Sequence, residues 1–158
     1  MDFSFLTYKP VLVGLHLGFA IVGIDAFLWL TGEFFAGTFG KLRVKVAALI
    51  GVVGFALSWL VGGYYYVVYY GKLVKPVIKA GVAPWAHAIF METKEHIFLF
   101  VIPLAVTALL LAFLKKEEIK EYNLSRLATV LVVLIALLGL LIGAMGYIVS
   151  AAARWGQS

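Results

Sequence analysis

Long apolar runs separated by short polar segments dominate the chain. Four runs are each long enough to cross a hydrocarbon core, which takes about 20 residues. They predict membrane spans over residues 10–33, 44–71, 92–116 and 124–154. The connections are short, as in a bundle whose consecutive helices run in opposite directions. The pattern therefore predicts a single all-α domain over residues 1–158, an integral membrane four-helix bundle of up-down-up-down topology.

Composition supports this class and excludes several others. Of the 158 residues, 64% are hydrophobic and 13% are charged, whereas a soluble domain has about 25% charged residues. The net charge of +5 comes from cations at span ends, where they face lipid headgroups, so we expect no nucleic-acid partner. The absence of cysteine excludes disulfides, thiolate metal sites and c-type haem attachment. The N-terminal MDFSFLTYKP lacks the features of a signal peptide, so no cleavage is expected.

Alternating spans place the starts of spans one and three beside the ends of spans two and four. All three histidines and the five tyrosines of GGYYYVVYYG (62–71) lie toward this side, which we call the tyrosine-rich end. The tyrosines are typical of an interfacial aromatic belt, and the alternative is that some line a cofactor or quinone pocket. Seven Lys and Arg residues lie at the opposite end and six at this one. The positive-inside rule thus favours an extracytoplasmic tyrosine-rich end by a narrow margin.

The segment PWAHAIFMETKEH leads into the third span and carries two of the three histidines. Side chains four residues apart share a helical face, so Glu92 is expected beside His96. At the same spacing, His87, Met91 and Glu95 form a second row. This segment is therefore predicted to be the ligand-bearing start of a membrane helix.

The remaining histidine, His16, lies about 9 Å inside the first span at 1.5 Å per residue. An ionisable side chain at such a depth is a functional candidate by default. Ala20 and Gly23 follow on the same helical face, and their small side chains would leave a groove for a flat macrocycle. Small-residue seams also occur where helices pack closely. The alternative for His16 is therefore a neutral imidazole hydrogen-bonded between helices.

A b-type haem is the cofactor that these positions favour. His16 and His96 open spans that run in the same direction, so their imidazoles are expected to meet across the bundle as axial ligands. Glu92 or Glu95 is expected to orient one imidazole by accepting its free N–H. Arg154, near the end of the fourth span, and the lysines at this end are expected to pair with the haem propionates.

A bare metal ion is the competing interpretation of the same residues. Imidazole and carboxylate suit zinc, iron and copper, so the candidate ligands are His16, His96 and Glu92, with His87 as a weaker fourth. On a helix His87 is about 13 Å from His96, so both bind one ion only if the helix breaks. We expect His87 to be interfacial, and either structural or an accessory ligand.

Asp25 is not expected to share a site with His16. It follows His16 by nine residues, which puts it on the opposite helical face and about 13 Å deeper. Because a charged carboxylate is costly at this depth, we expect Asp25 to be protonated, or bonded to Ser58, Thr107 or a tyrosine. A proton-relay role is the alternative.

These features together resemble a family of small four-span membrane proteins of prokaryotes. The similar parts are His16 to Asp25 in the first span, His96 at the third, and GLLIGAMGYIVSAAARWG in the fourth. Members of that family are suspected relatives of membrane b-type cytochromes. The resemblance implies a prokaryotic cell membrane as the location, with His16 and His96 as haem ligands. The tyrosine-rich end and His87 depart from the family pattern.

The sequence therefore predicts an electron-transfer protein with one non-covalent haem b, or the haem-bearing anchor subunit of a redox complex. As an enzyme it would be an oxidoreductase. The expected partners are the lipid bilayer, a membrane quinone, and other membrane subunits or copies of itself. Two alternatives stay open: a protein that binds or transports a metal ion, and a structural membrane subunit without a cofactor.

Overall fold

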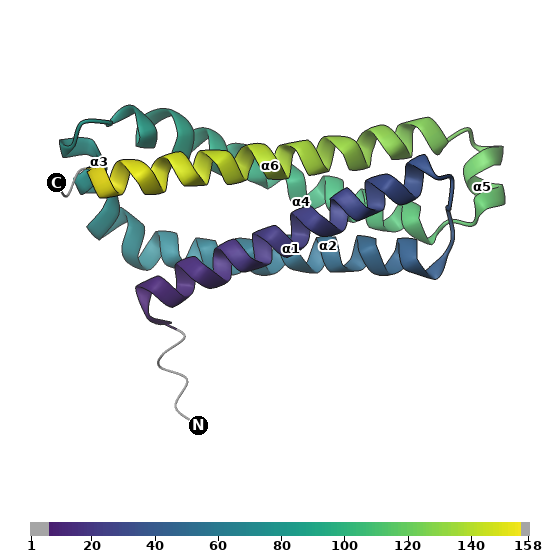
Figure 1. The fold of residues 1–158 in the computed structure, drawn as a ribbon, viewed down its shortest axis with the longest axis horizontal. Coiled ribbons are helices and arrows are strands. Elements are labelled where there is room, and N and C mark those ends of the chain that lie inside the picture. Colours follow the sequence, from purple (N-terminus) through teal and green to yellow (C-terminus); the bar gives the residue numbers. More distant parts are fainter. Residues whose placement is uncertain (1–6, 156–158) are drawn as a thin grey trace, which may run out of the picture.

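The fold is a bundle of four long antiparallel helices joined by short connections (Figure 1). The computed structural model describes residues 7–155, and within that range it contains no strand. The elements, in chain order, are α1 (Lys9–Phe35), α2 (Leu42–Tyr65), η2 (Tyr66–Val74), α3 (Lys75–Ala80), η3 (Ala86–Met91), α4 (Glu92–Phe113), α5 (Lys116–Glu121) and α6 (Ser125–Trp155). The predicted all-α bundle is confirmed.

Four continuous helical stretches are long and apolar enough to cross a membrane. They are Lys9–Phe35, Leu42–Ala80, Ala86–Phe113 and Ser125–Trp155. The second contains 39 residues, which is longer than a hydrocarbon core requires. The chain is thus an integral membrane protein, and its second helical stretch continues past the bilayer core at the tyrosine-rich end.

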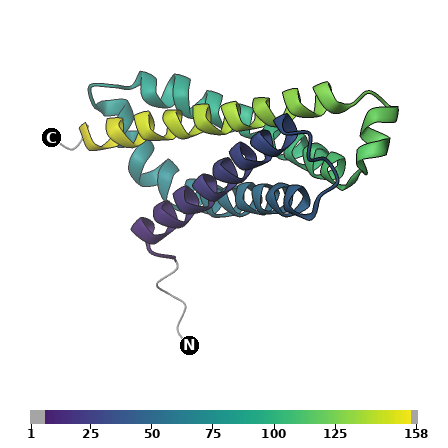
Figure 2. The same cartoon turned by 45° about the vertical axis from the view of Figure 1, so that its right-hand side comes forward.

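Each helix of the bundle has two neighbours. Helix α1 packs against α2 and α6, and α4 packs against the same two helices. Helices α1 and α4 therefore lie diagonally across the bundle. In both views α1 runs obliquely, from the end of α2 toward the start of α6 (Figures 1 and 2).

Glycines and two phenylalanines form the contact between α1 and α2. A Cβ on Gly54 would lie 2.8 Å from the backbone nitrogen of Gly23, so the two backbones touch. The rings of Phe27 and Phe55 stack with centroids 5.4 Å apart. Phe55 covers Gly23, and Phe27 covers Gly51, each within 2.6 Å of where a Cβ would lie. The space beside Gly23, which was predicted to hold a macrocycle, is therefore occupied by the Phe55 ring of α2.

Two π-helical segments distinguish the tyrosine-rich end. η2 continues α2 directly, and η3 leads into α4. A π-helix closes its hydrogen bonds five residues apart, is rare, and often occurs at functional sites. Both segments lie at the same end of the bundle, beside the last turns of α6 (Figure 1).

Candidate functional site

Ionisable and polar side chains gather inside the tyrosine-rich end, and we call this group the polar cluster. Its members come from α1, α2, η2, η3 and α4: His16, Ser58, Tyr66, Tyr70, His87, Glu92, Lys94 and Glu95. Further into the bundle the core is apolar, with Phe27, Leu30, Val101 and Ile135 fully buried. The polar cluster therefore lies at one end of the bundle, with an apolar core beneath it.

His16 and Ser58 join α1 to α2. The Nδ1 of His16 lies 2.8 Å from the main-chain oxygen of Ser58. Because a carbonyl only accepts, Nδ1 carries the proton in this bond and Nε2 is left as an acceptor. The Ser58 hydroxyl donates in return to the main-chain oxygen of His16, at 3.0 Å. A Cβ on Gly62 would lie 2.5 Å from the imidazole, so only glycine leaves room for the ring.

Lys94 extends from α4 into the space beside His16. Its Nζ lies 3.3 Å from the position of a Cβ on Gly146, in α6. Its charge also interacts with the His16 imidazole. The half-buried Lys94 side chain thus lies near both Gly146 of α6 and His16 of α1.

Glu95 carries the least satisfied polar atom of the cluster. Its Oε1 is buried and has no hydrogen-bond partner among residues 7–155. The Tyr66 phenol donates a hydrogen bond to the same carboxyl, and Lys94 and Glu92 are among its charged neighbours. A buried oxygen without a donor is costly, so this position has an unmet demand for a hydrogen-bond donor.

His87 is a buried joint between the two π-helical segments. It is 3% exposed, with Nδ1 3.1 Å from the Tyr70 hydroxyl and Nε2 3.5 Å from Glu92 Oε1. Both ring nitrogens are therefore engaged. The predicted row of His87, Met91 and Glu95 gives way to a contact between His87 and Glu92, because a π-helix brings together residues five apart. The expectation that His87 is interfacial, and either structural or an accessory ligand, stays a prediction.

His96 points away from the polar cluster. It is exposed, and its Nδ1 lies 2.6 Å from the main-chain oxygen of Glu92, one turn earlier in the same helical stretch. Lys94 points inward, and two residues at about 100° each turn His96 to the opposite side of α4. The structure therefore does not bring His16 and His96 together: one faces α2, and the other faces outward from α4.

The four candidate metal ligands are likewise dispersed. Among residues 7–155, no group of three or more His, Asp and Glu side chains could hold a metal ion. Of the candidates His16, His96, His87 and Glu92, only the last two meet side chain to side chain. No ligand set for zinc, iron or copper is assembled in this arrangement.

The remaining predicted residues lie apart from the imidazoles or are already engaged. Ala20 is half-buried on α1. The Nη1 of Arg154 donates to the Ser150 hydroxyl one turn before it, at 3.0 Å. Asp25 is exposed on α1. The hydroxyls of Ser58 and Thr107 donate to main-chain oxygens of His16 and Pro103, so their expected bonds to Asp25 are absent.

Lys94, Tyr66 and Tyr70 are members of the cluster that were not among the predicted site residues. Lys94 counted only as one of the cations at the tyrosine-rich end, and the two tyrosines only as members of the group of five. The available signal was the run ETKEH (92–96), which places four ionisable residues at the start of an apolar helix.

Comparison of the chain with protein families, curated proteins and solved structures found no significant match. The fold and the polar cluster therefore carry the functional argument, and the resemblance drawn from sequence stays a prediction.

Proposed function

We propose that the polar cluster binds the head group of a membrane quinol or quinone, and that the protein is a membrane subunit of a redox assembly. One observation carries this proposal. Polar side chains of η2 and α4 surround the carboxyl of Glu95, whose buried Oε1 has no donor among residues 7–155.

The cluster offers groups for both oxidation states of such a ligand. The two hydroxyls of a quinol donate, and they suit the free Nε2 of His16 and the Oε1 of Glu95. The two carbonyls of a quinone accept, and they suit the Lys94 ammonium and the Tyr66 phenol. A quinone also dissolves in the bilayer, so it reaches a site between helices from the lipid.

The position of the cluster fits proton release to one side. Oxidation of a quinol to a quinone yields two electrons and two protons. Glu95 and His16 are the proton acceptors beside the ligand, and the apolar core below them closes the route to the other side. The electrons leave one at a time to a redox centre in a partner subunit.

A binding experiment tests this proposal. Purified protein in detergent is titrated with decylubiquinone or menadione, and quenching of tryptophan fluorescence is measured. Loss of one charge-assisted hydrogen bond predicts about tenfold weaker binding in Glu95→Met and in Lys94→Met. The matched controls Glu121→Met and Lys116→Met change exposed residues of α5, at the other end, and should bind as the wild type does. Absence of binding, or equal affinity in all variants, would refute the quinone site.

A haem b is the second candidate, and a separate observation favours it. His16 and His96 each have Nδ1 bonded to a main-chain oxygen, at 2.8 and 2.6 Å. This is the arrangement that prepares Nε2 of a histidine for a metal. His87 has both nitrogens engaged. Because the first two rings face different directions, one chain would have to turn α4 to present both to the same iron.

An optical spectrum distinguishes this candidate. A haem protein shows a Soret band that is lost in His16→Ala and in His96→Ala and retained in His87→Ala. A colourless preparation from haem-supplemented cells would exclude haem b and leave the quinone proposal standing.

A further inference from the structure

Asp25 lies on the outer surface of the bundle, near the middle of a membrane span. Helix α1 runs from Lys9 to Phe35, so Asp25 is three residues past its midpoint, about 4.5 Å along the axis. The side chain is exposed. Among residues 7–155 it has no hydrogen bond and no ion pair. Lipid offers no donor at this depth, and a carboxyl facing hydrocarbon is unfavourable.

The surface around Asp25 is open to another helix. Gly18 and Gly32 lie seven residues before and after it, both exposed, and no atom lies within 4 Å of a Cβ on either. Residues seven apart lie along one seam of a left-handed helix pair, and glycines in such a seam let two backbones approach closely in lipid. Among residues 7–155, α1 makes its main contacts with α2 and α6, and Gly18, Asp25 and Gly32 lie on its exposed side.

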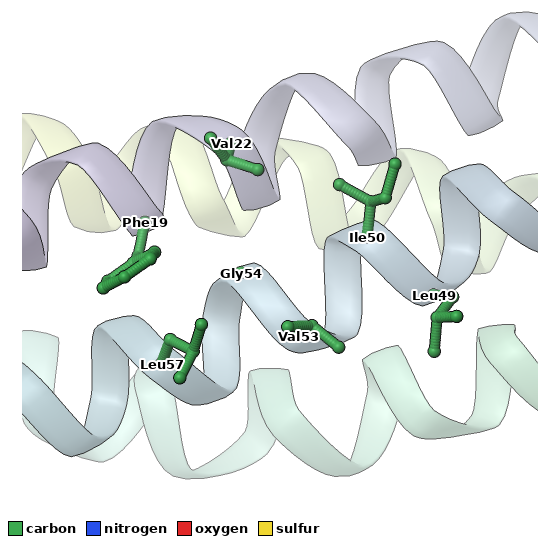
Figure 3. A pocket seen from close by; sticks show the side chains of 7 residues that line it. All are labelled: Phe19, Val22, Leu49, Ile50, Val53, Gly54 and Leu57. Carbon is green, nitrogen blue, oxygen red and sulfur yellow. The ribbon is translucent and has the colours of Figure 1, made fainter.

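A shallow groove continues the same surface toward α2. It has a volume of about 380 Å³ and is lined by apolar side chains of α1 and α2 (Figure 3). Val22, one turn before Asp25, belongs to this groove. The outer face of α1 and the groove together form one apolar surface with a single carboxyl in it.

We propose that this surface binds a second copy of the chain, with Asp25 of one copy paired to Asp25 of the other. A two-fold axis along the membrane normal places the same residue of both copies at the same depth. A carboxylic acid both donates and accepts a hydrogen bond, so two of them can satisfy each other. A two-fold contact requires such a self-complementary surface. The inference goes beyond the proposed quinone site and does not depend on it.

Disulfide cross-linking tests the pairing directly, because the chain has no cysteine of its own. Ile21→Cys places a thiol one turn before Asp25, on the exposed face of α1. In native membranes treated with a mild oxidant it should give a product of twice the chain mass. Leu110→Cys, on the outer face of α4 and 66% exposed, is the matched control and should remain monomeric.

The role of the carboxyl is tested in the same background. Ile21→Cys with Asp25→Leu should cross-link at least about tenfold less, the loss expected when paired hydrogen bonds are removed. Ile21→Cys with Asp25→Asn should still cross-link, because a carboxamide also donates and accepts. Cross-linking of Ile21→Cys no stronger than that of Leu110→Cys would overturn the proposal. So would cross-linking indifferent to Asp25→Leu, or a product whose mass shows a different protein as the partner.

Discussion

His16 and Ser58 hold α1 against α2 through reciprocal bonds, each side chain reaching the main chain of the other residue. The imidazole donates to the Ser58 oxygen at 2.8 Å, and the hydroxyl donates to the His16 oxygen at 3.0 Å. Ser58 is fully buried, and His16 is partly buried. The pair fixes the face of α1 that meets α2, and thereby the direction in which the opposite face points.

Gly62→Ala should destabilise the protein by about 1–3 kcal/mol, the usual cost of overpacking a tight contact. The new methyl group would lie 2.5 Å from the His16 ring, which is held by Ser58 and cannot withdraw without breaking that bond. Thermal unfolding in detergent micelles measures the change. The neighbouring Gly63→Ala is the control, because no atom lies within 4 Å of its Cβ. Equal stability of the two variants would contradict the placement of the imidazole.

Tyr70→Phe should cost about 1 kcal/mol or more of stability, because it leaves the Nδ1 of a buried histidine without its partner. The Tyr70 hydroxyl lies 3.1 Å from His87 Nδ1, and both residues are buried. Tyr64→Phe, at an exposed tyrosine in the same segment, should leave the midpoint of thermal unfolding unchanged. A loss of stability in Tyr64→Phe that equalled that of Tyr70→Phe would argue against a specific joint between η2 and η3.

Gly54→Ala should be among the most damaging single substitutions in the chain, by about 3 kcal/mol at the upper end of overpacking costs. Its methyl group would meet the backbone of Gly23 at 2.8 Å, and backbone cannot rotate aside. Gly143→Ala, on the exposed side of α6 with no atom within 4 Å, should instead stabilise its helix by about 0.5–1 kcal/mol. Opposite shifts in the unfolding midpoint are therefore expected, and shifts of the same sign would contradict the close contact.

Glu95→Met should raise stability by about 1 kcal/mol while it weakens quinone binding. The substitution removes a buried oxygen that has no donor among residues 7–155, and such an oxygen carries the desolvation penalty without the compensating bond. Unfolding and quinone titration of the same preparation measure both effects. A variant that is less stable than the wild type would show that this carboxyl is needed for folding rather than for a ligand.

The membrane fold was predictable because hydropathy and span length are properties of local sequence. Four apolar runs of sufficient length leave few alternatives to a helical bundle, and alternation then places the histidines at one end. The residues that face each other across successive turns were not predictable in the same way. His87 meets Glu92 instead of Met91 because the helix widens to a π-helix over Ala86–Met91. No residue in that segment indicates the change from an α-helix to a π-helix.

The predicted pairing of His16 with His96 failed to appear for a related reason. The depth of a residue in the membrane follows from residue counting. The direction in which its side chain points depends on which side of its helix the neighbouring helices cover. Gly62 and Ser58 draw His16 toward α2, and Gly146 leaves room for Lys94 to point inward. With Lys94 inside, His96 faces outward. These are pairwise contacts between distant parts of the chain, which periodicity within one segment does not reveal.

The wide turns of η2 make the register of the tyrosine-rich end sensitive to single-residue insertions and deletions. If the π-helical hydrogen bonding is kept, removing one residue between Tyr66 and Val74 rotates everything downstream around the helix axis by the step of one residue. Lys75 and the turn after it would then swing around the helix axis, and η3 would approach the tyrosines from another side. A relative shortened in this way would keep its spans and lose the contacts of Tyr70, His87 and Glu92. The length of the chain over η2 therefore distinguishes relatives that share the site from those that do not.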